Sequence, residues 1–259
     1  MDNLTKVMQP SGVLTGIFQL SFPISLYLGY ASSAGVGWWA LAFFSYAIVY
    51  IMIGHNIALH RYFAHNQFSV SKPVEYLFLW VGSMIGVGGP LSYGITHITH
   101  HTYPDTELDP HGPIRGWKSI LIYFQKPVDL TETKLFNRRV VELNKKYNLH
   151  HRFYLLFLLC NAAILFLVDY KIFLFMWWIP ASLACWSIGF TAWAQHKNFQ
   201  ANNSKIYKWV PIYEGLHKNH HEYPSRSNTA ILPNEIDYTY YFCKIFFTKY
   251  KIIKGNKDV

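Results

Sequence analysis

Long uncharged stretches alternate with polar and basic segments along this chain. About 20 predominantly apolar residues are enough for a helix to cross a bilayer core. Four stretches near that length carry at most one charged residue, and we predict a membrane-spanning helix in each: residues 12–30, 36–54, 152–168 and 172–193. The turns at 31–35 and 169–171 are so short that they join these helices into two antiparallel hairpins.

The second of these helices is predicted to extend beyond the membrane. If it continues from Val36 to His60, it is ~37 Å long at ~1.5 Å per residue, which exceeds a hydrocarbon core of ~30 Å. Its last turns, including His60, then lie just outside the bilayer.

Residues 74–93 form an apolar segment whose path is ambiguous. It contains Glu75 and the helix-breaking run GVGGP at residues 86–90. If the segment crossed the membrane, the histidines at residues 97–101 would lie on the opposite side from His60. We therefore predict an interfacial or re-entrant helix that packs against protein.

The distribution of Lys and Arg predicts the topology independently. Only 14% of the residues are charged and 51% are hydrophobic, whereas soluble domains carry about 25% charged residues. Of the 23 Lys and Arg residues, all but Lys6, Arg152 and Lys171 lie between residues 55 and 151 or after residue 193. By the positive-inside rule that side is cytosolic. The net charge of +9 is thereby assigned to cytosolic loops, and no nucleic-acid partner is expected.

These patterns predict an all-α integral membrane protein with a single domain over residues 1–259. We expect four transmembrane helices, one interfacial helix and a cytosolic helical cap, with both termini on the cytosolic side. In the cap, residues 134–152 are predicted to form a solvent-exposed helix, and the aromatic run at 238–247 is predicted to rest on the membrane surface. The N-terminus lacks the basic start and cleavage pattern of a signal peptide, and the spacing of the three cysteines predicts no disulfide.

Three histidine motifs fall on the predicted cytosolic side. Positions i, i+3 and i+4 share one face of a helix, so the histidines of each HxxHH motif can converge on one point. Imidazole binds iron, copper, zinc or nickel as the neutral base, and this many imidazoles exceed what one ion can hold. We therefore predict a site for two metal ions. The motifs are HRYFAH (His60 and His65), HITHH (His97, His100 and His101) and HKNHH (His217, His220 and His221).

The motifs resemble those of the membrane fatty-acid desaturases, in particular the acyl-CoA and acyl-lipid delta-9 desaturases. The resemblance covers residues 60–224 and rests on the segments LHRYFAH, HITHHTYPDTELDPHGP and YEGLHKNHHEYP. The family also uses a lone histidine at the cytosolic end of its fourth span, a place that His196 occupies. The resemblance implies that two irons are held by nine ligands: His60, His65, His97, His100, His101, His196, His217, His220 and His221.

The same resemblance implies an oxygen-dependent fatty acyl desaturase. Such an enzyme introduces a cis double bond, at position 9 by this resemblance, into a saturated acyl chain and reduces O2 to water. The implied substrate is an acyl-CoA, an acyl-lipid or an acyl-carrier conjugate. No redox domain is fused to the chain, so we expect electrons from a separate b-type cytochrome or ferredoxin. The basic candidates for holding an anionic head group are Lys72, Arg115, Lys118 and Lys218.

The sequence departs from the family pattern next to the lone histidine. The family commonly has Asn at the position of Ala192, where it holds a water on one iron, and Gln195 is the nearest amide here. Asp105 and Asp109, which follow the second motif, either form Asx turns or accept the outer N–H of ligating histidines.

The remaining histidines have plainer interpretations. His55 forms a second HxxxxH with His60, but the family pattern assigns the motif to His60 and His65. His111 is expected to help orient the second motif, and His150 and His151 are expected to snorkel toward the membrane surface.

Two other functions stay open from the residues alone. Hydroxylation of a lipid or alkane, or ketolation, uses the same scaffold, and histidine motifs do not distinguish these outcomes from desaturation. A metal transporter or a bis-histidine haem protein would place its histidines at mid-membrane depth. The histidines here lie outside the apolar runs, which disfavours that second alternative.

Overall fold

The computed structural model describes residues 6–7, 10–121, 128–129, 138–210 and 212–247. Regular structure in these residues is helical, as predicted, apart from one antiparallel pair of two-residue strands, β1 (Lys6–Val7) and β2 (Val128–Asp129).

Within the described residues, three helices are long and apolar enough to cross a membrane: Val13–Ala31, Val36–Ala64 and Tyr170–Gln195. They correspond to the predicted spans 12–30, 36–54 and 172–193. The second runs past its predicted end and carries His60, as expected. The first consists of α1 (Pro10–Ala31). The second consists of α2 (Val36–Phe44) and the π-type helix η1 (Ser45–Ala64). The third consists of α7 (Tyr170–Ile172), η4 (Phe173–Trp178) and α8 (Ile179–Gln195).

The fourth predicted span, residues 152–168, is part of a bent helix pair. Helices α5 (Arg138–Arg152) and α6 (Tyr154–Val168) meet at an angle of 53°. The 15 residues of α6 cover only ~22 Å at ~1.5 Å per residue, so the pair crosses a core of ~30 Å only if α5 contributes.

The prediction that this part of the cap is a solvent-exposed helix is wrong for one face of α5. Val140, Leu143 and Tyr147 are buried. A methyl group added at Gly94 of α4 would lie 2.5 Å from Leu143 Cδ1, so the two helices approach each other closely. The apolar positions at i, i+3 and i+7 of α5 therefore pack against the protein, and Lys145 and Lys146 between them are exposed.

The predicted interfacial segment 74–93 is two helices rather than one. Helix α3 (Lys72–Met84) and helix α4 (Pro90–Thr102) are separated by a break in which Gly86 and Gly88 both have φ of 95°, a backbone region that favours glycine. Neither helix is among those long enough to cross a membrane. Their placement at the membrane surface stays a prediction.

The surrounding helices satisfy the backbone carbonyls at this break. Side chains from α6, η4, α8 and α1 each donate one hydrogen bond, and the four pairs are Tyr154 to Ser83 O, Trp177 to Met84 O, Cys185 to Ile85 O and Thr15 to Gly86 O. Non-helical backbone at membrane depth is tolerated only where protein satisfies its polar groups. The four hydrogen bonds therefore fix the backbone at the break between α3 and α4. This fixed bend directs α4 toward the end of η1.

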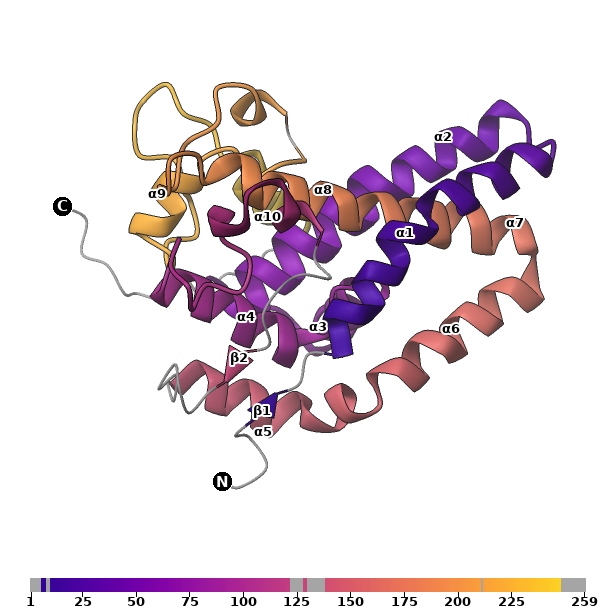
Figure 1. The fold of residues 1–259 in the computed structure, drawn as a ribbon, viewed down its shortest axis with the longest axis horizontal. Helices are drawn as coiled ribbons and strands as arrows, with labels where there is room; N and C mark the ends of the chain where they lie inside the picture. The colour runs from indigo at the N-terminus through magenta and orange to yellow at the C-terminus, as the bar shows by residue number, and fades with distance from the viewer. Residues whose placement is uncertain (1–5, 8–9, 122–127, 130–137, 211, 248–259) are drawn as a thin grey trace.

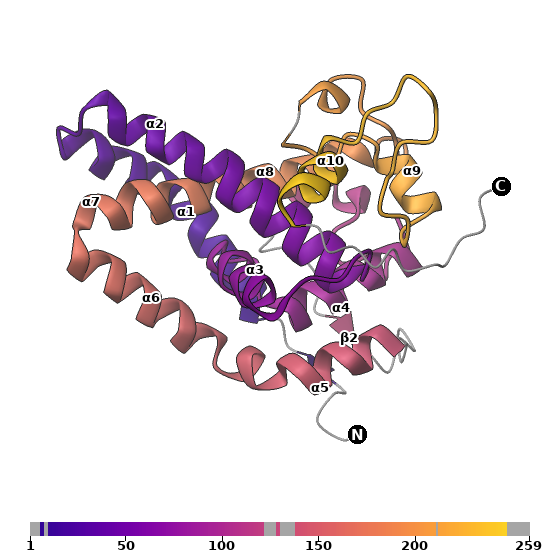
Figure 2. The same ribbon diagram turned by 180° about the vertical axis from the view of Figure 1, so that it is seen from behind.

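The helices are arranged with the polar segments gathered at one end (Figure 1). Helices α1, α2–η1 and α8 run beside one another, and α6 joins them through α7 at the far end. Seen from behind, α3 lies between η1 and the α5–α6 arm (Figure 2). The polar end contains η2 (Pro113–Ile120), η5 (Tyr207–Trp209), α9 (His217–Glu222) and α10 (Tyr238–Phe246).

Candidate metal centre

Five imidazoles from three elements converge where η1 ends. His60 and His65 lie five residues apart, and the His65 N–H donates to His60 O across the wide turn of a π-type helix. In such a turn, residues i and i+5 share a face, which explains how HxxxxH can converge. His97 and His101 come from α4, and His220 comes from α9. The Nε2–Nε2 distances are 2.8 Å for His60–His220 and His65–His97, 2.9 Å for His101–His220 and 3.1 Å for His97–His101.

Four other imidazoles form a second cluster. His100 comes from α4, His196 follows the last residue of α8, and His217 and His221 lie one turn apart on α9. Their Nε2–Nε2 distances are 2.8 Å for His196–His217, 3.1 Å for His217–His221 and 3.2 Å for His100–His221. The structure thus brings all nine predicted histidines together, as one group of five and one group of four.

Two carboxylates hold the outer nitrogens of the second cluster. His100 Nδ1 lies 2.8 Å from Asp109 Oδ2, and His196 Nδ1 lies 3.1 Å from both carboxylate oxygens of Asp105. Both aspartates are thus outer partners of the clustered histidines. Asp109 also accepts the backbone N–H of His111, so it shapes the loop as an Asx turn would. With Nδ1–H directed at a carboxylate, each ring presents the Nε2 lone pair inward.

A third carboxylate, Glu214, was not singled out from the sequence. Its Oε1 lies 3.8 Å from His60 Nδ1, longer than a hydrogen bond, and both of its oxygens accept from Arg61. The signal that could have found it is the acidic residue three positions before His217 in EGLHKNHH. Gln195, the amide noted beside Ala192, donates to the backbone oxygen of Glu214 at 2.7 Å and so supports the same loop.

Burial keeps seven of the clustered histidines neutral. Loss of hydration, reinforced by neighbouring imidazoles, lowers the pKa of His221 to about 3 and holds the pKa of six more well below the ordinary value: His65, His97, His100, His101, His217 and His220. Burial alone would raise the pKa of Glu214, but Arg61 and His60 hold it well below its usual range, so the carboxylate is charged. Neutral imidazole is the form that binds a metal ion.

The spacing of the nitrogens fits metal coordination. Neighbouring Nε2 atoms are 2.8 to 3.2 Å apart in both clusters. Two nitrogens ~2.1 Å from one ion are ~3.0 Å apart at a right angle and ~3.4 Å apart at the tetrahedral angle. The observed spacing therefore fits imidazole nitrogens that share one ion. Inward lone pairs this close repel one another unless a cation lies between them.

A cavity of about 100 Å³, partly open to solvent, reaches both clusters. His60, His97, His100 and His217 line one part of it. The apolar residues Ile51, Val87 and Ile188 line another part, together with small or polar side chains of α8, among them Ala192. Ligand cavities in proteins commonly have a mainly apolar lining with a few polar groups.

The other histidines lie outside both clusters. His55 lines the cavity, with Nε2 3.0 Å from Tyr93 Oη and Nδ1 2.8 Å from Asn56 Oδ1. His111 groups with His100 and Asp109 and also faces the cavity.

Two further groups of predicted residues are placed as follows. His150 packs beside the α3–α4 break, 3.3 Å from Ser83 Oγ, and His151 is half-buried. Of the basic candidates for a head group, Lys72, Lys118 and Lys218 are exposed, and the side chain of Arg115 lies outside the described residues.

Comparison with known proteins identifies the same region. Residues 37–231 match the family model described as Fatty acid desaturase. The sn-2 palmitoyl-lipid 9-desaturase of Nostoc sp. (strain 36) is 28% identical over 76% of this chain and 74% of its own length. The acyl-CoA 5-desaturase AL21 of Anemone leveillei is 29% identical over 75% of this chain and 64% of its own length. The delta-9 acyl-lipid desaturase 1 of Arabidopsis thaliana is 27% identical over 76% and 69%.

Proposed function

Because the chain belongs to the fatty acid desaturase family, a family of oxidoreductases, we propose that it is an oxygen-dependent acyl desaturase with two irons. One observation carries this proposal: two groups of inward-facing imidazoles meet one largely apolar cavity. The proposed ligands are His60, His65, His97, His101 and His220 for one iron and His100, His196, His217 and His221 for the other.

The reaction assigned to the site converts a –CH2–CH2– unit of an acyl chain and O2 into –CH=CH– and two waters, with two electrons and two protons from outside. A mid-chain methylene has no acidic proton and no leaving group, so the oxidising power comes from metal-activated oxygen. The protein's own residues orient the metal ligands and the acyl chain, and they shield the site from water. Asp105 and Asp109 fix the ligating rings, and the cavity walls hold the acyl chain against the clusters and exclude water.

The substrate class follows from the relatives by analogy. Their names include acyl-lipid and acyl-CoA substrates and double bonds at positions 9 and 5. The proposed substrate is a long saturated acyl group carried by lipid, CoA or a carrier protein. The motif resemblance supports position 9 for the double bond. Electrons are assigned to a separate b-type cytochrome or ferredoxin. The metal site and both termini are assigned to the cytosolic side, where the basic residues gather.

Fatty-acid analysis in a host that lacks its own desaturase tests the proposal. The host, supplied with an electron-transfer partner, is expected to gain a monounsaturated acid with the chain, and the mapped double bond gives the position. His100→Ala is expected to abolish the product, because it removes a ligand from the four-histidine cluster and the proposed reaction requires both irons. His151→Ala is the matched control and is expected to retain it. Hydroxylated or oxo acids in place of the alkene would move the assignment to hydroxylation or ketolation.

A further inference from the structure

The charges around the two clusters are unequal. In the four-histidine cluster, Asp105 and Asp109 each contact a ring Nδ1 at hydrogen-bond distance. In the five-histidine cluster, His60 Nδ1 is buried and has no hydrogen-bond partner among the described residues. Its facing carboxylate, Glu214, is 3.8 Å away and is paired with a cation.

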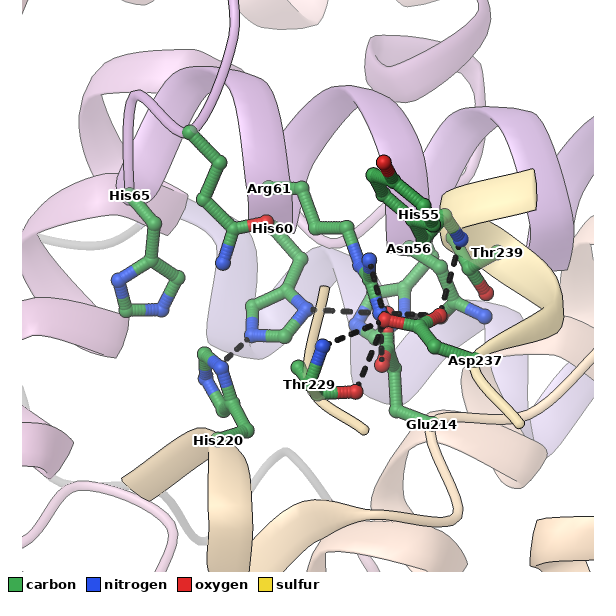
Figure 3. Close-up of polar contacts among 12 residues, drawn as sticks. His55, Asn56, His60, Arg61, His65, Glu214, His220, Thr229, Asp237 and Thr239 are labelled. Atoms are coloured by element: carbon green, nitrogen blue, oxygen red, sulfur yellow. Dashed lines mark hydrogen bonds and ion pairs between the residues drawn. The ribbon is translucent and has the colours of Figure 1, made fainter. Parts of the chain in front are cut away.

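That cation is Arg61, the residue next to His60 on η1. It is only 1% exposed, and its guanidinium contacts two carboxylates at once (Figure 3). Nε and Nη2 donate to Glu214 at 2.6 and 2.7 Å, while Nη1 and Nη2 lie 2.9 Å from the oxygens of Asp237. One positive charge is therefore shared by two negative charges, and the excess is one negative charge beside His60.

Asp237 is held in place independently of Arg61. It lies at the N-terminus of α10, where its Oδ1 accepts the backbone N–H of Tyr240 at 2.9 Å. Its Oδ2 accepts the backbone N–H of Thr229 at 2.8 Å and the Thr229 hydroxyl at 2.9 Å. These contacts come from the first turn of α10 and from the loop before it, so the carboxylate is presented to Arg61 by a different part of the chain from Glu214.

We propose that Asp237 is a positioning residue for the metal centre: by sharing the charge of Arg61, it leaves the Glu214 carboxylate able to attract the Nδ1–H of His60 and so strengthens metal binding at the five-histidine cluster. The inference rests on the proposed function, because it requires both clusters to hold a metal. Without the Asp237 charge, the positive charge of Arg61 fully offsets the negative charge of Glu214. No net negative charge then remains beside His60 to favour a bound cation.

The contacts of Arg61 predict which cluster a substitution of Asp237 affects. Asp237→Asn keeps the size of the side chain and an oxygen that accepts hydrogen bonds, but it removes the charge. Changes in the outer partners of metal ligands typically cost about 10- to 100-fold in metal affinity. We expect a loss in that range at the five-histidine cluster and no change at the other cluster, whose aspartates do not contact Arg61.

A chelator titration of the purified, metal-loaded full chain in detergent tests the inference. Metal bound per chain is measured by elemental mass spectrometry after equilibration with graded EDTA concentrations. Asp237→Asn is expected to release one of two metals at an EDTA concentration at least about tenfold lower than the wild type does. Asp237→Glu, which keeps the charge, is expected to restore most of the difference. Asp105→Asn should move the release of the other metal, and Glu142→Gln, at an exposed ion pair with Arg138, should move neither.

Four results would overturn the inference. Unchanged release in Asp237→Asn would show that the Asp237 charge does not reach the site. An equal shift of both metals, or the same loss in Asp237→Glu, would show a general effect on folding. A wild-type chain that binds fewer than two metals would remove the proposed two-metal site itself, and that failure is visible before any variant is made.

Discussion

At the scale of single residues, the two ring nitrogens of His100 and of His196 have separate roles. The inner nitrogen, Nε2, faces its cluster, and the outer nitrogen of His100 and of His196 is held by a carboxylate. A ring fixed in this way offers one lone pair in one direction, so little order has to be acquired when an ion binds.

Asp109→Asn tests whether a carboxylate on the outer nitrogen strengthens metal binding at the inner nitrogen. Asp109 is 0% exposed and contacts His100 at 2.8 Å. The amide keeps one oxygen but no charge, so it polarises the Nδ1–H of His100 less. We expect metal affinity at the four-histidine cluster to fall by about 10- to 100-fold, measured by dialysis against chelator. Full affinity in this variant would mean that the carboxylate serves only the loop.

At the scale of helices, the buried side chain of Glu75 connects α3 to α5. It accepts the Tyr147 hydroxyl at 2.6 Å and pairs with Lys146 and Lys72. Burial would raise the pKa of Glu75, but these partners together lower it to about 2. The same residue that argued against a membrane span therefore serves as a link between two helices at the polar end.

The sign of the pH dependence follows from the depressed pKa. The carboxylate contributes stability at pH values above its unfolded pKa of 4.5, and the contribution is lost as the pH falls toward 2. We expect Glu75→Gln to lower the melting temperature in detergent at pH 7, and the gap from the wild type to narrow below pH 4.5. A constant gap at all pH values would contradict the ionic link.

Helix-scale features also show what the sequence could and could not predict. Three of the four predicted spans correspond to long apolar helices because spans follow from local composition, and the HxxHH histidines converge because of their helical spacing. The corner between α3 and α4 depends on donors from four other helices, among them Tyr154 and Trp177. The roles of Arg61 and Glu214 depend on a contact between residues 153 positions apart. No local pattern carries such information.

At the scale of the whole molecule, the arrangement separates an apolar end from a polar end that holds both clusters (Figure 1). The turn at residues 31–35 and the turn at 169–171 lie at the end away from the clusters. Because the basic residues gather at the cluster end, we propose that this end faces the cytosol.

Cysteine labelling tests this orientation. Ser33 lies in the first turn and Ser225 lies just after the third histidine motif, and both are exposed. In a background with Cys160→Ala, we expect a membrane-impermeant maleimide to label Ser33→Cys on intact cells and Ser225→Cys only after permeabilisation. The reverse pattern would place the histidine clusters outside the cytosol.

The central claim is that nine histidines hold two irons, and the iron content of the purified chain tests it most directly. Elemental analysis with a quantitative protein assay is expected to give two irons per chain in the wild type, with no haem absorption band. His100→Ala is expected to lose iron from the four-histidine cluster while His151→Ala retains both. A wild-type ratio of one or none after iron-replete expression, or a haem spectrum, would contradict the account.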